Sequence, residues 1–386
     1  MVKPYSGRSP VRVIAMLTVS VALAIAGASC GSSSSGGGNA ATATVASSAS
    51  PGIALAKERI APLLVRPTSI GSYPPITKPI PKGKKIVILN CGTACTTLVT
   101  SAVEAATKLG WSVKTIVLGP SPADEVNGWQ QAVELHPDAV LSSGISRSVF
   151  AQQLAELDKE GVPYFGCCTY ESVPYKNHLV DVAGTYDYAR RGRLMADWVL
   201  AHKGTAANTI LVDASSFPAD GEQDQTFKQE YESLCPKCKF TYLDVQSTDI
   251  GTTLPAKVVS AVQRDPGANY LVFGIGVMTE GVPQALRAAG LAQQVQAISQ
   301  NPTLSDFQNI KNGDVEVAGL ALDEHLLGWA MIDGAARHFA GEPLPQQAYA
   351  IQPTQFVTKS NLIDPGSDYT AVANYQGQFE KLWGLG

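Results

Sequence analysis

The sequence has little charge of either sign and no surplus of basic residues. Charged residues make up 16% of the 386 residues, and 29 Lys and Arg against 33 Asp and Glu give a formal net charge of −4. This composition argues against a nucleic-acid partner, because such proteins carry a basic surface. After residue 26 no apolar run is long enough to cross a bilayer, which argues against a protein with several membrane spans.

Motifs of common enzymes are also missing. The chain has no G-x-S-x-G and no Walker loop, and Gly274-Ile275-Gly276 lacks the third glycine and the later acid of a dinucleotide-binding fingerprint. None of the five histidines is paired in an obvious nucleophile arrangement: His136, His178, His202, His325 and His338. We therefore expect no catalysis and no cofactor.

The first 30 residues have the pattern of an export signal. Lys3, Arg8 and Arg12 precede an almost wholly apolar run over 13–26. The run is too short to span ~30 Å of hydrocarbon at ~1.5 Å per residue. The sequence Gly27-Ala28-Ser29-Cys30 resembles the lipobox of bacterial lipoproteins, although Gly27 stands where that family usually has a branched aliphatic residue. This resemblance implies acylation of Cys30 and an extracytoplasmic chain anchored to the outer face of the membrane; plain secretion and an uncleaved anchor are the alternatives.

The residues after Cys30 predict a tether followed by two lobes. Residues 31–50 are dominated by Gly, Ser, Ala and Thr and are expected to form a flexible tether. The rest of 31–83 is a short segment before the main domain, with one helix predicted near 53–64 from its apolar spacing. About 300 residues remain, which is more than a single hydrophobic core usually holds.

Short β-branched runs alternate with helical patterns along the rest of the chain, which predicts an α/β fold with parallel sheets flanked by helices. In the first half, strands are expected at 86–89, 113–118, 139–141, 162–165 and 178–182, with helices at 96–109, 124–135 and 149–160. In the second half, strands are expected at 209–212, 240–245, 271–273 and 296–298, with helices at 186–203, 227–234, 254–264 and 281–289. The repeated pattern predicts two similar lobes.

Several segments carry a family resemblance. KKIVIL at 84–89, AATKLGW at 105–111, GVPYF at 161–165, MTEG at 278–281 and QALRAAG at 284–290 resemble the type I periplasmic solute-binding proteins, especially the ribose- and galactose-binding branch. The resemblance implies two Rossmann-like lobes that close on a solute, joined by three hinge crossovers near Gly184, Asp323 and Ala350. Lobe 1 would then hold residues 84–183 and 323–350, and lobe 2 residues 184–322 and 351–386.

The same resemblance points to loops after the strands as the binding site, where open parallel sheets also place their ligands. This chain departs from the sugar-binding branch at each of these loops. Gly92, Ala94 and Cys95 stand where that branch has Asn and aromatic residues, and Cys168 and Thr169 stand in place of an Asp-Arg pair. In the second lobe, Gln223 stands in place of an Arg, Ile275 and Gly276 in place of an Asn-Asp turn, and Gln300 in place of an acid. Because buried donors and acceptors of a sugar cost roughly 1–3 kcal/mol each when unpaired, we expect a ligand other than an ordinary hexose.

The predicted ligand-binding residues are Asn90, Cys95, Cys168, Thr169, Tyr170, Phe217, Gln223, Ile275, Gly276, Gln300, Asn301 and Asp323, with Tyr186 and Glu324 as further candidates. Core packing is the alternative for Tyr170 and Phe217, and hinge hydrogen bonding for Asp323 and Glu324.

Six cysteines follow Cys30, an even number that suggests disulfides outside the cytoplasm. Cys235 and Cys238 are expected to form a local disulfide, with redox chemistry as the alternative. Cys91 closes onto Cys95, or one of them bridges to Cys167 or Cys168; a soft-metal site built from these thiolates is a further alternative.

We expect a monomeric solute-binding protein that serves an ABC permease, with a sensory receptor component as the alternative and an enzyme as the weakest one.

Overall fold

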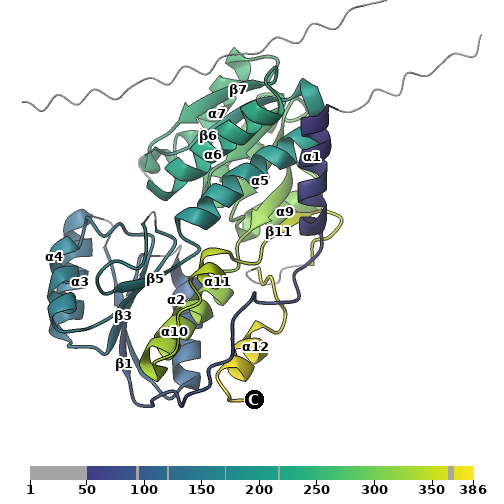
Figure 1. The fold of residues 1–386 in the computed structure, drawn as a ribbon. Helices are drawn as coiled ribbons and strands as arrows, with labels where there is room; N and C mark the ends of the chain where they lie inside the picture. The colour runs from purple at the N-terminus through teal and green to yellow at the C-terminus, as the bar shows by residue number, and fades with distance from the viewer. Residues whose placement is uncertain (1–49, 93–94, 120, 170, 216–217, 364–368) are drawn as a thin grey trace, which may run out of the picture. The chain divides into compact units, whose positions relative to one another are not determined.

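The computed structural model describes residues 50–386 except 93–94, 120, 170, 216–217 and 364–368. The described residues belong to a compact unit, Ser48–Gly386, which holds two β-sheets with helices packed on them (Figure 1). The predicted α/β fold is confirmed. Within the described part of the chain, no helix combines the length and the apolar character needed to cross a membrane.

The first sheet is wholly parallel, with strand order β2-β1-β3-β4-β5. Helices on both faces bury all of its strands except the edge strand β2, which explains why the buried strands read as apolar runs without alternation. The strands are β1 (Lys85–Asn90), β2 (Ser112–Val117), β3 (Ala139–Ser143), β4 (Tyr164–Cys167) and β5 (His178–Val182). The helices that cover them are α2 (Thr96–Lys108), α3 (Pro122–Glu134), α4 (Ala151–Lys159), α10 (Glu324–Ala340), α11 (Gln346–Ala350) and α12 (Tyr375–Leu382).

The second sheet has the order β11-β10-β9-β8-β6-β7, in which β11 pairs antiparallel with β10 and the other strands are parallel. Its strands are β6 (Asn208–Asp213), β7 (Lys239–Asp244), β8 (Tyr270–Phe273), β9 (Gln296–Gln300), β10 (Glu316–Ala321) and β11 (Gln355–Thr358). Its helices are α1 (Pro51–Ile60), α5 (Thr185–Lys203), α6 (Pro218–Leu234), α7 (Leu254–Arg264), α8 (Val282–Ala288) and α9 (Leu304–Asn312). Short 3₁₀ turns complete this layer: η1 (Ala61–Leu64), η3 (Gly204–Ala206), η4 (Ser247–Asp249) and η5 (Gly276–Thr279).

The chain crosses between the two sheets at the three predicted places. It leaves the first sheet at 183–184 between β5 and α5, returns at 322–323 between β10 and α10, and crosses again at 351–354 between α11 and β11. α5 packs in the core of the second sheet and α10 in the core of the first, so each crossing joins two separate cores.

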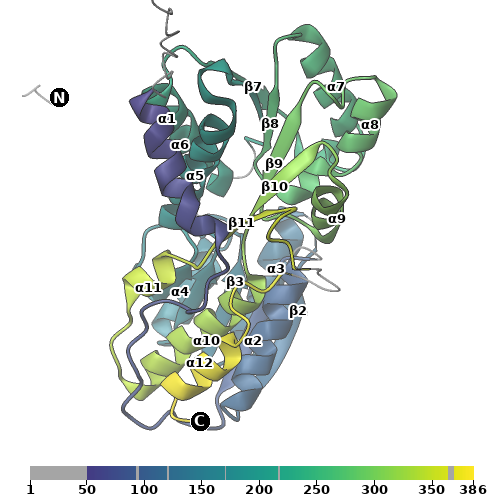
Figure 2. The ribbon, with the colours of Figure 1, turned by 90° about the vertical axis from the view of Figure 1, so that its right-hand side faces the viewer.

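Two further passages were not predicted. Residues 65–81, here called the N-terminal strap, run from η1, which contacts β11, to the core of the first sheet, where Ile70, Tyr73 and Ile76 are buried. After β11 the chain returns to the first sheet and ends in α12, which packs on α10 (Figure 2).

These passages correct the predicted domain boundaries. The assignment of residues 351–386 to the second lobe holds for β11 and is wrong for α12, because Tyr375, Phe379 and Trp383 recur at helical spacing and bury one apolar stripe in the core of the first sheet. The segment before residue 84 is also more than a linker: Ile53 and Ile60 of α1 are buried in the core of the second sheet.

A buried ion pair joins the strap, α10 and α12. Asp333 and Arg337 are both buried, and Arg337 Nε donates to Asp333 Oδ2 at 2.7 Å. The same carboxylate accepts hydrogen bonds from the Tyr349 hydroxyl at 2.7 Å and from the Trp383 indole at 2.8 Å. Arg337 also donates to the carbonyl of Pro74 in the strap at 2.6 Å. The carboxylate of Asp333 therefore holds three separate segments together.

Asp333→Asn tests how much this network contributes to the stability of the fold. The substitution leaves Arg337 buried without a counter-charge, so we expect the free energy of unfolding, measured by urea titration, to fall by about 3 kcal/mol. The control is Glu160→Gln, which breaks the exposed pair with His136 and should cost less than about 1 kcal/mol. A loss as small for Asp333→Asn as for the control would contradict the role given to the network.

Candidate functional site

The predicted site residues lie at or just beyond the carboxyl ends of the strands in both sheets. In the first sheet Asn90 ends β1, Cys95 precedes α2, and Cys168 and Thr169 follow β4. In the second sheet Gln223 lies in α6 after β6, Ile275 and Gly276 follow β8, and Gln300 and Asn301 end and follow β9. Ala94, Tyr170 and Phe217 lie outside the described residues, as does Cys30. Parallel strands present these ends on one edge of their sheet, which is the edge where such folds bind ligands.

Hydrogen bonds and sulfur contacts shape the first loop. Asn90 Oδ1 accepts the backbone N–H of Gly92 at 3.0 Å, so this amide folds the loop. Cys95 Sγ lies 3.1 Å from the hydroxyl oxygen of Ser143, which is 4.0 Å from Cys91 Sγ. Ser143 ends β3 and was missed by the sequence analysis; its signal is the pair of serines before a glycine at the end of an apolar strand.

The six later cysteines form three local pairs. The Cα atoms of Cys91 and Cys95 are 5.6 Å apart, Cys167 and Cys168 are adjacent in the chain, and the Cα atoms of Cys235 and Cys238 are 5.4 Å apart. Of the two arrangements that the sequence left open, the structure has the one in which Cys91 meets Cys95. Across the described residues, no group of three or more His, Cys, Asp or Glu side chains is arranged to hold a metal ion.

The loop after β4 rests on a buried carboxylate. The backbone N–H of Thr169 donates to Asp181 Oδ1 at 3.3 Å, and burial raises the pKa of Asp181. Gly184 lies so close that an added Cβ would stand 2.1 Å from Asp181 Oδ2, so the first crossing requires glycine there. The side chain of Thr169 is buried and also hydrogen-bonds to Asp181, so this residue is held to the carboxylate by both its backbone and its hydroxyl group.

An ion pair joins this loop to the one after β3. Arg147 Nε and Glu171 Oε2 are 2.5 Å apart, and the backbone N–H of Arg147 donates to Glu171 Oε1 at 2.6 Å. Arg147 Nη1 lies 3.3 Å from Nδ1 of His178, which is fully buried on β5. Burial, together with the charge of Arg147, lowers the pKa of His178 to about 3. The imidazole is therefore neutral near pH 7 and accepts from Arg147 at Nδ1.

Close packing leaves one polar atom without a partner at the edge of the second sheet. Gln223 is fully buried and donates from Nε2 to the carbonyl of Gly274 at 2.9 Å, whereas its Oε1 has no hydrogen-bond partner among the described residues. Gly276 has no room for a side chain, since a Cβ would stand 2.5 Å from the carbonyl of Asn301. Gln300 is 2% exposed at the end of β9.

Asp323 serves the second crossing. Its Oδ1 accepts the backbone N–H of Leu326 at 3.1 Å and caps α10, and its Oδ2 accepts the backbone N–H of Ala371 at 2.7 Å. Beside it, Asn301 Nδ2 donates to Glu324 Oε1 at 3.2 Å and so links the end of β9 to the first turn of α10. These contacts support the hinge alternative for Asp323 and Glu324.

Sequence reasoning also missed an acidic group at the ends of β6 and β7. Asp213 ends β6, and Asp244 ends β7 and accepts from the backbone N–H of Ser215 at 3.0 Å. Burial raises the pKa of Asp224 to about 6, against hydrogen bonds from Asp213 and Tyr242 that lower it. Asp213 and Asp244 each follow an apolar run, which is the signal that could have identified them.

The first crossing carries a second group that the sequence analysis did not single out. Arg191, in the first turns of α5, is buried and donates from Nε to Asp187 Oδ2 at 2.8 Å. Its Nη1 donates to the carbonyl of Ala321 at 3.3 Å, which ties α5 to the end of β10 beside the second crossing.

His178→Gln tests the buried neutral histidine. Since burial lowers its pKa below the ordinary 6.5, the folded state binds fewer protons than the unfolded chain between those two values, and stability falls as the pH falls through that window. We expect the wild-type midpoint of thermal unfolding to drop more steeply than that of the variant between about pH 7 and about pH 5. The raised pKa of Asp181 makes the protein more stable as the pH falls, which is the opposite effect. Because Asp181 is present in both proteins, its effect cancels when the two unfolding midpoints are subtracted. Parallel curves would refute the assignment.

Comparisons with known proteins agree with this arrangement. Residues 93–343 match the family model of the periplasmic binding protein domain, and no curated protein matches the chain significantly. GanP, a glucose-galactose binding protein from Geobacillus stearothermophilus, has 15% identity and a TM-score of 0.64, with 73% of this chain and 99% of that chain covered. A 5-methylthioribose transporter solute binding protein from Thermotoga lettingae has 18% identity and a TM-score of 0.64, with 79% and 95% covered. A periplasmic ribose ABC transporter structure from Conexibacter woesei has 15% identity and a TM-score of 0.63, with 74% and 94% covered.

At these identities the solved structures are evidence for the fold alone. The family model, however, spans well over half of the chain and describes solute-binding proteins. Two parallel sheets joined by the three predicted crossings complete the agreement. The chain therefore belongs to the periplasmic binding protein family and has its two-lobed type I fold.

Proposed function

We propose that this protein is an extracytoplasmic, lipid-anchored solute-binding protein that captures a small, weakly polar molecule between its two lobes and delivers it to an ABC importer. The family match and the fold support the solute-binding role. The export signal and Cys30 support the anchor. Location outside the cytoplasm also favours oxidation of the three local cysteine pairs to disulfides.

The observation that carries the proposal is the polar carboxyl edge on each of two sheets that three crossings join. Thr169 lies at the edge of the first sheet and Gln223 at the edge of the second, where Gln223 Oε1 is buried without a hydrogen-bond partner in the described residues. A buried polar group left unpaired costs roughly 1–3 kcal/mol. A ligand that contacts both edges makes all of its contacts, including one to Gln223 Oε1, only when the lobes approach each other, so binding favours the closed state.

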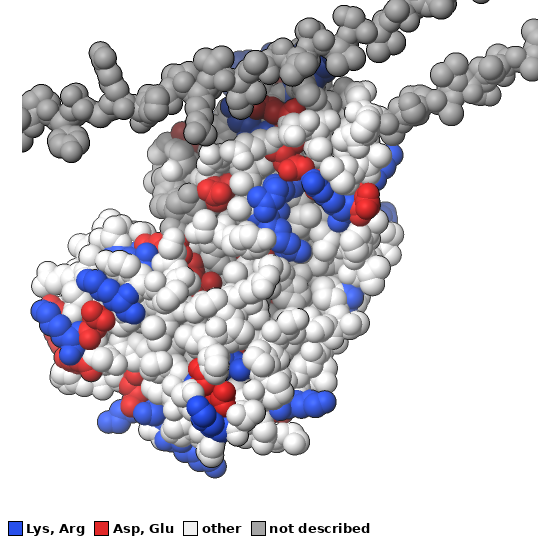
Figure 3. Space-filling model, viewed as in Figure 1, with Lys and Arg blue, Asp and Glu red and all other residues white. Residues whose placement is uncertain are grey.

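The ligand class follows from the chemistry of the edges. Cys168, Thr169, Ile275 and Gly276 carry no charge and offer few acceptors for a ring of hydroxyl groups. The edge carboxylates of Asp213 and Asp244 already accept hydrogen bonds from the backbone N–H groups of Ala214 and Ser215. Charges on the face shown in Figure 3 are also sparse and of both signs. Tyr186, which is 55% exposed just after the first crossing, supplies an aromatic surface for an apolar group. We propose a neutral ligand with few hydroxyl groups and one apolar substituent.

Thermal unfolding of the full chain in detergent, with a panel of added compounds, tests the ligand class. The panel holds common pentoses, hexoses, polyols, nucleosides, aromatic acids and sugars with one apolar substituent, and a ligand at 100 times its dissociation constant adds ~2.7 kcal/mol of stability. We expect the apolar-substituted neutral compounds to raise the unfolding midpoint most. Strong stabilisation by ordinary pentoses and hexoses would show that the ligand class is wrong.

Gln223→Leu then tests the site itself. Loss of the Oε1 acceptor should weaken binding of the best compound by about tenfold, which corresponds to ~1.4 kcal/mol, in isothermal titration. The matched control is Gln152→Leu on the exposed face of α4, which should leave affinity unchanged. Equal affinity in Gln223→Leu and wild type would remove Gln223 from the site.

Cys30→Ala tests the anchor. Without the thiol no acyl chain can be attached, so incorporation of labelled palmitate should be lost and the chain should move from the membrane fraction to the soluble fraction. Ser29→Ala, which keeps the thiol and a small residue, should retain both label and membrane association. A Cys30→Ala protein that stays in the membrane would favour an uncleaved anchor.

A sensory receptor in place of the permease would use the same recognition between lobes. Both partners read the closed form, and the genes that neighbour this one separate the two.

A further inference from the structure

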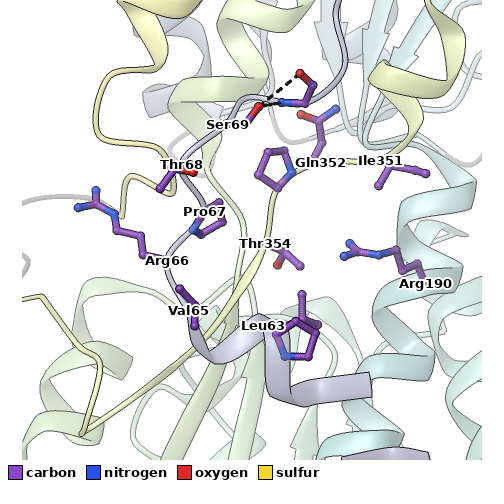
Figure 4. A pocket seen from close by; sticks show the side chains of 13 residues that line it. Leu63, Val65, Arg66, Pro67, Thr68, Ser69, Arg190, Ile351, Gln352 and Thr354 are labelled. Carbon is purple, nitrogen blue, oxygen red and sulfur yellow. Dashed lines mark hydrogen bonds between the residues drawn. The ribbon is translucent and has the colours of Figure 1, made fainter. Parts of the chain in front are cut away.

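A cavity of about 480 Å³ lies where the N-terminal strap passes the third crossing between the sheets (Figure 4). Three parts of the chain line this open cavity: residues 62–71 of η1 and the strap, residues 351–354 of the crossing, and Arg190 on α5. None of these residues belongs to the carboxyl edges described above, so this cavity is separate from the proposed solute site. Its volume is in the range of small-molecule sites, ~300–1,000 Å³.

Arg190 supplies a positive charge directed into this cavity (Figure 4). Its Nη1 donates to Asp187 Oδ1 at 3.3 Å, but Asp187 also accepts from Arg191 Nε at 2.8 Å. Two guanidinium groups thus share one carboxylate, and within the described residues Arg190 has no other ion-pair partner. Arg66 also lines the cavity but donates to the carbonyls of Ala371 and Thr370, at 3.0 and 2.7 Å. Arg66 keeps its charge, but in Figure 4 its guanidinium points away from the cavity, so the charge directed into the cavity is that of Arg190.

Gln352 supplies a second, independent sign of a ligand. Its side chain lines the cavity and is 2% exposed. The amide nitrogen donates to the carbonyls of Ala348 and Tyr349, at 3.2 and 2.7 Å, which fixes which end of the amide is the nitrogen. The opposite end, Oε1, is buried and accepts no hydrogen bond in the described part of the chain. A ligand with an O–H or N–H group would satisfy it.

The rest of the wall is largely apolar. Its apolar members are Pro62, Leu63, Val65, Pro67, Ile351 and Pro353. We propose that this cavity is a second ligand site, which takes a small monocarboxylate with an apolar body and one hydroxyl or N–H donor. The carboxylate pairs with Arg190, the donor meets Gln352 Oε1, and the apolar body lies against the prolines and aliphatic side chains.

The position of the cavity links it to closure of the lobes. Its wall includes the third crossing itself and Arg190 of α5, six residues after the first crossing. Hinge motion changes the geometry of this wall, so the second ligand binds the open and closed forms with different affinity. By thermodynamic linkage, the ligand of this site then changes the affinity of the solute site by the same factor.

Isothermal titration of the full chain in detergent with 4-hydroxybenzoate tests the proposal, with neutral 4-hydroxybenzamide as the matched probe. We expect saturable binding of the acid, and binding of the amide that is weaker by at least about tenfold because it lacks the charge. Arg190→Gln should weaken the acid by at least about tenfold and leave the amide unchanged. Arg193→Gln removes the same charge from the same helix outside the cavity wall and should leave the affinity for the acid within about twofold.

Val65→Trp gives a second measurement that does not depend on a buried residue. Val65 is 71% exposed and lines the cavity, so the larger side chain obstructs the entrance and should weaken both probes without loss of cooperative unfolding. Absence of saturable binding of the acid to the wild type overturns the proposal. So does binding that survives both Arg190→Gln and Val65→Trp but is lost in Gln223→Leu. That last result would place the acid in the solute site and would leave the proposed solute-binding function intact.

Discussion

Burial of both faces of the inner parallel strands in each sheet is the constraint on which the rest of this structure depends. Helices cover the two faces, so polar groups that must meet a ligand are confined to the carboxyl edges, where the strands end and loops begin. The loops are then held by main-chain carbonyls and buried carboxylates. Asp181 holds the loop after β4, and the carbonyl of Gly274 holds Gln223. These contacts give the loops at the carboxyl edges a rigid base.

The hinge combines tight packing with shared charges. Gly184 fits against Asp181 with no space for a side chain, Asp323 caps α10 and also holds the backbone at Ala371, and Arg191 reaches the carbonyl of Ala321. Each of these contacts lies at or next to a crossing. Groups that fix the crossings so closely confine relative motion of the lobes to a few backbone positions, which is how hinged binding proteins convert ligand contacts into closure.

Segments outside residues 93–343, the part that matches the family model, add a second connection between the cores. The N-terminal strap and α12 share hydrogen bonds, including that from the backbone N–H of Ile76 to the carbonyl of Leu382 at 2.8 Å. On α10, Arg337 donates to the carbonyl of Pro74 in the strap and Asp333 accepts from the indole of Trp383 in α12, so this ion pair ties both segments to α10. Because α1 and β11, at the other ends of these segments, belong to the second sheet, the strap spans the hinge and lines the cavity beside it.

The sequence by itself determined β1 to β9, the helices up to α8 and the presence of two lobes, because apolar periodicity is local and survives in any α/β context, whereas β10, β11 and α9 to α12 were not predicted. The strand at 178–182 matches β5, and the three crossings fall where they were predicted. The helix predicted at 227–234 begins earlier, at Pro218, because residues 218–226 have no apolar periodicity and include Gly221. Only the tertiary structure decided which cysteines meet and that α12 returns to the first sheet. It also decided that Asp323 serves the hinge and that Gln223 and Gln352 each keep an oxygen without a hydrogen bond. Those facts depend on contacts between residues far apart in the chain, and no local pattern records them.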